Sequence, residues 1–591
     1  MIYPIGVIYY VCTQTVFYSP IEIVKRAVII HCLTITRVLI VDIRSETDRK
    51  KVGGVLRSKN SVKNNPGLNR RLSISYVVGL HMAFFLPGIA GGCADTAAEW
   101  HQAAGPRGDF ASALSAPLDW SVVKNKNIRW RLKLPETGQS TPVISQGRLY
   151  FTTFASVTKD STLGKDLVAW CCSAKTGRVM WQRKINGKHP LRLSGCFGDS
   201  SSPPAVCSDD RVVFLNASGR IVCFDLKGRE IWTRDVLSVG RTLPFEIDGL
   251  YVFTRQQYPP DPNGVFPHKY SDLPKTQWTN LHALDITTGE DVWSSTCGVN
   301  MGNAVLPQTL NDGRQVSVVG RGGGHGPPEK PEGISLIDLK TGRTLWTLPL
   351  AGFMSTMSYC VRNDEVHIFH RGEHLSIDAI DGTFMRRASI VGDVTLRKWN
   401  GVRYVSSVET LKASNKNRMI TQTSNLLVGK HHYFRCYTRP WLGRVNVTNG
   451  TLEYLELPLQ LKTTAAVDPE LIWYQSPLND KSTGLNQQSF TSNSMTNSSG
   501  FIVSGDKRSS GNGWGHIASP VPSVAGDHLY IPVMNGTVYV VRWNADKLDE
   551  HALVGINDLG TAGESWTRAS LSFSNRRIYA HTIKELICIE K

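Results

Sequence analysis

Several short motifs that mark common enzyme classes are missing from this sequence. It contains no GxSxG, no HExxH and no GxxxxGK[ST], which excludes motif-based assignment to α/β-hydrolases, HExxH metalloproteases and P-loop NTPases. Its 12 cysteines include no CxxC pair, so no structural zinc module is predicted. No long segment after residue 95 shows a helical hydrophobic period, which excludes a helical bundle.

The sequence also lacks a charge pattern typical of nucleic-acid binding. The net charge is +17, but residues 1–92 alone hold 12 Lys+Arg against 4 Asp+Glu. The rest of the chain shows no stripe of basic residues interleaved with aromatics. We therefore expect no nucleic-acid partner.

What the sequence does contain is repetition, which predicts a repeat architecture. One phrase joins an apolar strand, a turn that ends in Gly and a strand that carries Trp. It occurs as ALDITTGEDVW (283–293), LIDLKTGRTLW (336–346), CFDLKGREIW (223–232) and LVAWCCSAKTGRVMW (167–181), with weaker copies at 375–385 and 442–454. The structural repeat positions are Gly177, Trp181, Gly228, Trp232, Gly289, Trp293, Gly342 and Trp346. Gly suits these turns because it adopts positive φ without steric cost.

A second phrase alternates with the first and is rich in β-branched and aromatic residues. Clear copies are STPVISQGRLYFTT (140–153), TLPFEIDGLYVFT (242–254) and SPVPSVAGDHLYIPV (519–533), and about eight occur in all. Together the two phrases make a unit of four short strands, which cannot bury both faces alone but can in a closed ring. The sequence therefore predicts an all-β, eight-bladed propeller of four-stranded antiparallel blades over residues 127–591. The last unit ends without a Trp strand, so we expect NIRWRLKL (127–134) to complete it.

The region before the repeats has the pattern of an export signal. Residues 72–92 carry no charge, Arg70 and Arg71 precede them, and small residues follow up to Cys93. We predict a signal peptide or a membrane anchor over 69–94, with twin-arginine and lipoprotein signals as variants. Residues 1–68 are interpreted as a start assigned too early or a disordered segment, and 95–126 as a lead-in. The predicted location is the periplasm or cell envelope, with a possible membrane tether.

The two phrases resemble the PQQ-like repeat, named from quinoprotein alcohol dehydrogenases. The residues that carry the resemblance are ALDITTG-EDVW, LIDLKTG-RTLW and CFDLKG-REIW, and the lead-in EWHQAAGPRGDF (99–110) looks like that of secreted propellers from planctomycetes and other environmental bacteria. The resemblance covers residues 99–591 apart from insertions. It implies the propeller fold, with the repeat tryptophans packed between blades, but one fold hosts many functions.

The resemblance also raises the question of a quinone site. The family's dehydrogenases hold PQQ, a tricarboxylate, with Ca²⁺, under a ring of adjacent disulfide-bonded cysteines. No Glu-Asn-Asp set in this sequence matches the calcium ligands. Cys171 and Cys172 are adjacent, but they lie in a predicted strand where consecutive side chains point to opposite faces, so we interpret them as structural.

Three insertions are the places where loops could carry chemistry. They are residues 255–280, residues 321–333 and a Ser/Thr/Asn-rich stretch at 457–515 that we expect to be flexible. The second insertion joins a Gly run to His325 and Glu329, which are candidate acid/base groups. The alternative is that this insertion is only a turn between blades. No catalytic or metal-ligating residue is otherwise predicted.

The resulting hypothesis is an exported, non-catalytic propeller that binds a protein, a glycan or a small ligand at its loops. The alternative is a quinoprotein-type oxidoreductase that uses PQQ and calcium in the central funnel.

Overall fold

The computed structural model is built from β-strands throughout its described part. It describes residues 99–157, 163–193, 199, 201–265, 279–300, 304–322, 331–353, 358–400, 402–412, 424–436, 439–464, 470–474, 520–534, 536–560 and 565–591. All of them belong to the compact unit Gly92–Lys591. Within these ranges no helix is long and apolar enough to cross a membrane.

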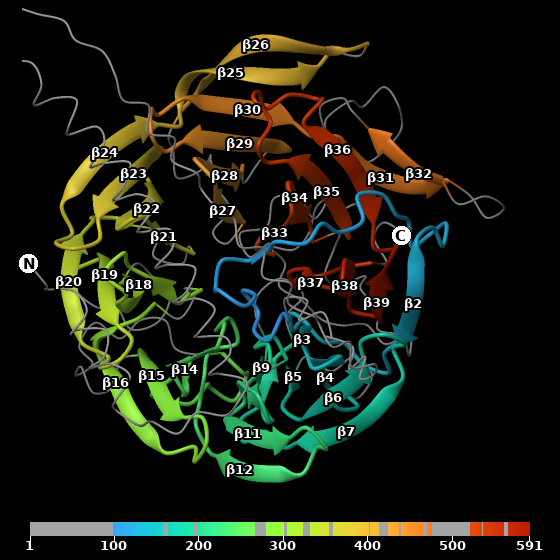
Figure 1. Ribbon diagram of the computed structural model, residues 1–591, viewed down its shortest axis with the longest axis vertical. Helices are drawn as coiled ribbons and strands as arrows, with labels where there is room; N and C mark the ends of the chain where they lie inside the picture. Colours follow the sequence, from blue (N-terminus) through green and yellow to red (C-terminus); the bar gives the residue numbers. More distant parts are fainter. Residues whose placement is uncertain are drawn as a thin grey trace, which may run out of the picture. The chain divides into compact units, whose positions relative to one another are not determined.

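Eight antiparallel sheets of four strands each are arranged in a ring, so the predicted eight-bladed propeller is confirmed (Figure 1). We number the blades in chain order. Blade 1 holds β3 (Val143–Ser145), β4 (Arg148–Phe154), β6 (Leu167–Ser173) and β7 (Val179–Ile185); blade 2 holds β9 (Val206–Cys207), β10 (Arg211–Asn216), β11 (Arg220–Asp225) and β12 (Glu230–Arg234). Blade 3 holds β13 (Phe245–Ile247), β14 (Leu250–Arg255), β15 (Asn280–Asp285) and β16 (Asp291–Gly298); blade 4 holds β17 (Gln308–Thr309), β18 (Gln315–Arg321), β19 (Gly333–Asp338) and β20 (Thr344–Pro349).

The second half of the ring repeats this plan. Blade 5 holds β21 (Cys360–Arg362), β22 (Glu365–His370), β23 (Glu373–Asp378) and β24 (Phe384–Ser389); blade 6 holds β27 (Asn425–Val428), β28 (His431–Arg435), β29 (Trp441–Asn446) and β30 (Leu452–Glu456). Blade 7 holds β33 (Ser523–Ala525), β34 (His528–Pro532), β35 (Thr537–Arg542) and β36 (Leu553–Asp558); blade 8 holds β37 (Ser572–Ser574), β38 (Arg577–His581), β39 (Glu585–Ile589) and β2 (Ile128–Lys133). In the blades whose first strand is labelled in Figure 1 (β3, β9, β21, β27, β33 and β37), that strand lies nearest the centre of the ring.

Blade 8 shows how the ring is closed. Its outer strand, β2, comes from the beginning of the described chain and pairs antiparallel with β39, with Trp130 opposite Cys588 and Leu132 opposite Leu586. This is the closure predicted from the missing Trp strand of the last unit. The two ends of the ring are therefore joined by backbone hydrogen bonds rather than by side-chain packing alone.

Four additions to the eight blades were not expected from the repeats. A hairpin of β25 (Gly392–Trp399) and β26 (Tyr404–Leu411) extends blade 6 into a six-stranded sheet, because β25 pairs parallel with β30. Small two-stranded sheets join β31 (Leu459–Thr464) to β32 (Glu470–Tyr474), and β5 (Leu163–Gly164) to β8 (Leu191–Arg192). Finally, β1 (Ala111–Ser112) adds a parallel strand beside β33.

The repeated Gly turn and the repeated Trp meet at the outer rim of neighbouring blades. A Cβ on Gly289 would lie 2.7 Å from Trp232 of the preceding blade, and φ at this glycine is +74°. The indole Nε1 of Trp232 donates to the backbone O of Ile286 in the same turn, at 3.1 Å. The same glycine contact recurs in the pairs Gly177–Trp130, Gly228–Trp181, Gly342–Trp293 and Gly382–Trp346. A side chain at the turn would displace the indole, which explains why glycine recurs there.

The interface between blades 5 and 6 departs from this rule. Four residues after Gly382, where blades 1 to 4 have Trp after their turn glycine, blade 5 has Arg386. Its Nε donates to the backbone O of Val447 in the blade 6 turn at 3.1 Å, so the hydrogen bond survives although the indole is lost. Arg386 also forms an ion pair with Glu365.

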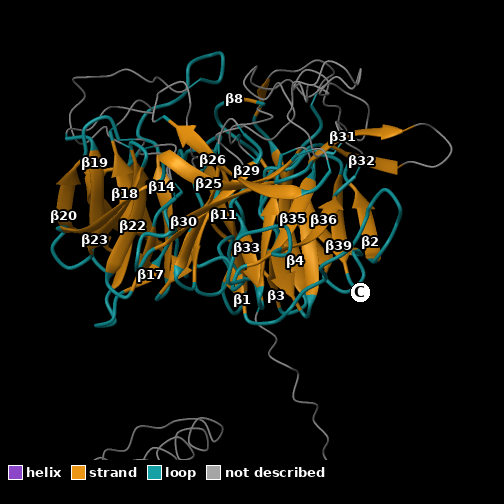
Figure 2. Ribbon diagram, turned by 90° about the horizontal axis from the view of Figure 1, so that it is seen from above, coloured by secondary structure: helices purple, strands orange, loops and turns teal. Residues whose placement is uncertain are grey.

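The residues before β2 cross one end of the ring. Within this crossing segment (residues 99–112), Trp100 accepts a backbone hydrogen bond from Ile144 of blade 1, and His101 accepts one from Cys207 of blade 2. The side chain of Gln102 accepts one from the backbone N of Glu246 in blade 3, and the backbone O of Phe110 accepts one from Val524 in blade 7. Trp100 and Phe110 are fully buried. The crossing segment thus covers the inner strands at the end where β1 and β3 lie (Figure 2).

Candidate ligand-binding site

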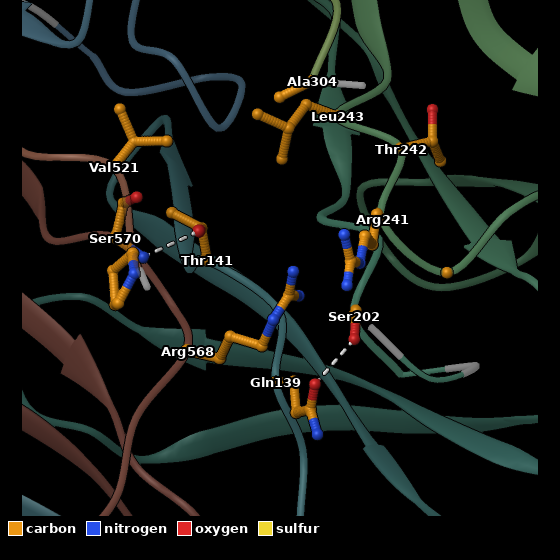
Figure 3. A pocket seen from close by; sticks show the side chains of 12 residues that line it. Gln139, Thr141, Ser202, Arg241, Thr242, Leu243, Ala304, Val521, Arg568 and Ser570 are labelled. Carbon is orange, nitrogen blue, oxygen red and sulfur yellow. Dashed lines mark hydrogen bonds between the residues drawn. The ribbon is translucent and has the colours of Figure 1, made fainter. Parts of the chain in front are cut away.

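The opposite ends of the inner strands surround a cavity near the ring axis. Equivalent residues line it, each four positions before the first strand of its blade. These are Gln139 in blade 1, Ser202 in blade 2, Arg241 in blade 3, Ala304 in blade 4 and Arg568 in blade 8. We call this set the mouth position. The cavity, shown in Figure 3, has a volume of about 40 Å³ and is also lined by Thr141, Thr242, Leu243, Val521 and Ser570.

Hydroxyl groups hold the lead-in to the inner strand in blades 1 and 3. The backbone N of Thr152, on β4, donates to Ser140 Oγ at 2.9 Å, and the backbone N of Thr254, on β14, donates to Thr242 Oγ1 at 3.0 Å. Ser140 and Thr242 occupy the same place in blades 1 and 3, directly after the mouth position. Blade 8 is tied to blade 1 by a hydrogen bond from the backbone N of Ser570 to Thr141 Oγ1 at 3.1 Å. These bonds satisfy buried backbone donors and fix the direction of the lining.

A buried polar network supports the mouth between blades 1 and 2. Ser202 Oγ donates to Gln139 Oε1 at 2.8 Å, and Gln139 Nε2 donates to the Asp199 carboxylate at 3.0 Å. The same carboxylate accepts from the backbone N and the hydroxyl of Ser201, at 3.0 and 2.7 Å. Gln139, Asp199 and Ser202 are each at most 6% exposed. A buried carboxylate is tolerated where several donors reach it, so this network holds Gln139 in a fixed orientation.

The two arginines give the cavity its charge. Arg241 and Arg568 are the charged side chains among the described residues that line it. Figure 3 shows both side chains reaching toward the same space from different blades. Both are half-buried.

The predicted loop candidates His325 and Glu329 lie outside the described residues. The same holds for residues 266–278 and 475–519 of the other insertions. The repeat positions Gly177, Trp181, Gly228, Trp232, Gly289, Trp293, Gly342 and Trp346 lie on the outer part of the blades and line the contacts between them. The mouth position was missed by the sequence analysis, although it directly precedes or begins the Pro-led phrases.

Cys171 and Cys172 lie back to back on β6 and are free thiols. Cys171 packs in the cluster shared with blade 2, whereas Cys172 packs in the cluster shared with blade 8. Burial raises the pKa of the Cys171 thiol to about 11 and that of Cys172 to about 12. The thiolate is the reactive form, so both are held in an inert state.

A Ser–His–Asp set occurs on blade 3, away from the cavity lining. His282 Nδ1 lies 2.5 Å from Ser294 Oγ, and His282 Nε2 lies 2.9 Å from Asp291 Oδ1. The equivalent residues of blade 4, Ser335 and Thr347, bond each other at 2.9 Å. Because a polar tie recurs at the same place without a histidine, we interpret the set as a tie between the third and fourth strands rather than as a nucleophile.

A group of buried histidines lies between blades 5 and 6. His374 Nε2 is 3.2 Å from His432 Nδ1, and His432 Nε2 is 3.0 Å from Asn425 Oδ1. The ring of His367 stacks on that of His374, with centroids 5.5 Å apart. Burial, followed by the charge of Arg386, lowers the pKa of His374 to about 4. Burial and the neighbouring His374, Arg386 and Arg362 lower the pKa of His367 to about 3.

The described residues hold no group of three or more His, Cys, Asp or Glu side chains placed to bind a metal ion. In the mouth itself, the oxygen ligands are hydroxyls and the amide of Gln139, whose oxygen already accepts from Ser202. Calcium prefers several carboxylate or carbonyl oxygens. The described lining therefore does not fit a calcium ion paired with a tricarboxylate quinone.

The chain is similar to several known proteins. The family model described as outer membrane protein assembly factor BamB matches residues 122–243 and 275–425. One similar solved structure is quinohemoprotein alcohol dehydrogenase from Comamonas testosteroni, with 11% identity and a TM-score of 0.46 over 83% of this chain and 80% of that chain. A europium-containing methanol dehydrogenase has 12% identity and a TM-score of 0.44 over 82% of this chain and 89% of that chain. BamB from Moraxella catarrhalis has 12% identity and a TM-score of 0.40 over 78% of this chain and 99% of that chain. A search of the curated proteins found no significant match.

The ring of blades first defines a class, the eight-bladed β-propellers. Within that class, residues 122–243 and 275–425 match the family model, and this agrees with the resemblance of the Gly–Trp phrases to the PQQ-like repeat.

Proposed function

We propose that this protein is an exported, non-catalytic binding propeller whose ligand enters the cavity at the mouth position. The observation that carries the proposal is the lining of that cavity, to which at least five blades contribute residues at one equivalent position. Concave sites with a few fixed polar groups are the usual binding sites of folded proteins. Export is supported by the uncharged stretch at 72–92 after Arg70 and Arg71.

The crossing segment favours a site with a single entrance. It covers the inner strands of blades 1, 2, 3 and 7 at the end opposite the mouth. A ligand that reaches the ring axis therefore approaches from the mouth, where the insertions after β14 and β18 also begin. A protein, a glycan or a small molecule remains compatible with this geometry, as does a tether to the membrane through the N-terminal segment.

The quinoprotein alternative receives less support from the site. The mouth has no acidic side chain in its described lining, and its volume of about 40 Å³ is far below the roughly 300 Å³ of a drug-sized ligand pocket. We derive no reaction through the quinone for this reason.

A direct test compares binding with catalysis in the purified full chain. Protein is incubated with PQQ and Ca²⁺, and thermal shift, the absorbance spectrum and dye-linked alcohol oxidation are recorded. We expect no dye reduction. Calcium-dependent quinone binding with alcohol oxidation would overturn the proposal in favour of the oxidoreductase. Export is tested separately, by locating the protein in cell fractions and sequencing its mature N-terminus.

A further inference from the structure

We propose that a second site, on the outer rim between blades 1 and 2, binds a neutral stretch of glycan chain. This outer groove has a volume of about 270 Å³ and is lined by β7 of blade 1 and by β11 and β12 of blade 2. These three strands lie side by side on the outer part of the ring (Figure 1). The outer groove is separate from the mouth, so it is a site in addition to the one proposed above.

The next interface along the ring shows how the protein can close such a groove with its own side chains. Val222 in blade 2 and His282 in blade 3 are equivalent, because each pairs with the residue that follows the repeat tryptophan of its blade. His282 bonds Ser294 and Asp291, and Asp291 also pairs with Arg234 at 3.0 Å. The polar groups between blades 2 and 3 are therefore engaged within the protein.

In the outer groove the same places are not closed in this way. Val222 brings no polar atom, and Glu230 takes the place of Asp291, two residues before the tryptophan. Arg183, two residues after the tryptophan of blade 1, donates from Nε to the backbone O of Gly228 at 2.7 Å rather than to a carboxylate. Within the described part of the chain, the Glu230 carboxylate forms no hydrogen bond or ion pair, so it is available to a ligand.

The charges of the lining favour a neutral ligand. Lys184 and Arg220 line the outer groove, but each is already paired with an aspartate, at 3.0 and 2.9 Å. The remaining charges of the described lining are the guanidinium of Arg183 and the carboxylate of Glu230. An anion is repelled by the carboxylate and a cation by the guanidinium. A hydroxyl group both donates to a carboxylate and accepts from a guanidinium, so a polyhydroxyl ligand suits both.

The shape of the outer groove favours a chain of sugar units over a compact molecule. Glu230 and Thr233 are three residues apart on the extended strand β12, which separates them by roughly 10 Å along the groove. The hydroxyl of Thr233 donates to the backbone O of Ile221 at 3.1 Å, which leaves its oxygen able to accept from a ligand. Asn186, directly after β7, adds an exposed amide to the lining. The volume corresponds to on the order of nine water molecules in the liquid.

The experiment applies the fluorescently labelled full chain to an array of neutral oligosaccharides built from glucose, mannose, galactose and N-acetylglucosamine, with sulfated and sialylated glycans beside them. We expect binding to at least one neutral chain and no preference for the charged ones. The neutral oligosaccharide with the strongest signal is then titrated by calorimetry. Glu230→Ala should weaken its binding by about tenfold, because hydrogen bonds to a charged acceptor are the stronger kind.

Matched variants separate recognition from folding. Val222→His copies the blade 3 arrangement into the outer groove, so the new imidazole should occupy the space beside Glu230 and Thr233 and abolish binding. Glu290→Ala removes an exposed carboxylate from the blade 3 turn, outside the groove, and should leave binding unchanged. The thermal unfolding midpoint of each ligand-free variant shows whether it is folded. Glu230 is exposed, so its variant decides the question if Val222→His does not fold.

Three outcomes would overturn the outer-groove site: no binding to any neutral oligosaccharide, binding to the charged glycans alone, or binding by folded Glu230→Ala as tight as that of the unmodified protein. None of them touches the proposed function, which fails instead if PQQ and Ca²⁺ support alcohol oxidation. In the third outcome the glycan binds elsewhere on the propeller.

Discussion

The outer rim and the mouth of this propeller use the same repeat in different ways. At the outer rim, the contact of a turn glycine with the tryptophan of the preceding blade recurs in five pairs of neighbouring blades. At the mouth, equivalent positions carry Gln, Ser, Arg, Ala and Arg. A position that repeats its residue type is constrained by packing, whereas a position that changes it from blade to blade is free to serve a ligand. The following predictions test this difference, beginning with the largest effect.

The largest effect is expected in the pH dependence of stability at the interface between blades 5 and 6, which lacks the Gly–Trp contact. Unfolded histidine titrates near pH 6.5, but the buried His374 titrates near 4 in the folded state because of burial and Arg386. Between these values the unfolded chain binds the proton and the folded chain does not, so stability falls as pH falls from 6.5 to 4. His374 alone should cost about 3 kcal/mol over this range.

Urea unfolding at pH 7, 5.5 and 4.5 measures this loss, and hydrogen exchange locates it. The charged and titratable groups around the cluster are His367, His432, Arg362, Arg386 and Glu365, which is 3.9 Å from His367. Exchange that rises first in β22, β23 and β28 supports the prediction. A uniform rise around the ring would contradict it.

The next effect concerns the regular contact itself. Gly289→Ala should destabilise the fold by about 3 kcal/mol, because the methyl group would collide with Trp232 and φ is positive. Gly313→Ala is the matched control: its φ is +88°, but a Cβ there meets nothing within 4 Å. It should cost only the backbone strain, about 1 kcal/mol. Equal losses in chemical unfolding would show that the tryptophan contact contributes little.

A smaller effect on stability is expected when Trp232, a repeat tryptophan, is compared with Arg386, which takes the equivalent place in blade 5. Trp232→Ala should cost about 2 kcal/mol, since it removes indole packing and the bond to Ile286. Arg386→Ala should cost less than about 1 kcal/mol, because Arg386 is 41% exposed in its side chain and solvent screens its ion pair with Glu365. Denaturant midpoints at neutral pH give both values, and a larger loss for Arg386→Ala would reverse the interpretation of this interface.

The smallest effect is expected at the mouth. Arg241→Ala reproduces the residue that blade 4 carries at the same position, Ala304, and should change the free energy of unfolding by less than about 0.5 kcal/mol. A loss of 2 kcal/mol or more would place Arg241 among the structural residues, and the contrast between rim and mouth would disappear.

The sequence predicts the blades well because each is a local unit. The Gly–Trp phrases at 223–232, 283–293 and 336–346 became the paired outer strands of blades 2, 3 and 4. Blade 7 escaped the pattern because β35 and β36 are joined by a longer connection without the Gly turn. The β25–β26 hairpin was missed for a similar reason, since it belongs to no repeat.

The site was harder to predict than the fold, for a physical reason. Arg241 and Arg568 are more than 300 residues apart, and they come together only through the curvature of the complete ring. The signal was present as the residue four places before each inner strand. However, the residue type at this position differs from blade to blade, so the equivalence becomes apparent only when the strands are aligned by their position in the structure. For the same reason, the sequence did not predict the contacts of Trp100, His101 and Gln102 with blades 1, 2 and 3.

Strand β2 has a consequence for how the molecule is made. It lies near residue 130, yet its hydrogen-bonding partner β39 is not synthesised until more than 450 residues later. Until then its edge is open, and so is that of the growing row of finished blades. A chain that ended just before β39 would have seven complete blades and an unclosed ring with exposed strand edges. Closure of the whole molecule therefore depends on the last few residues of this strand.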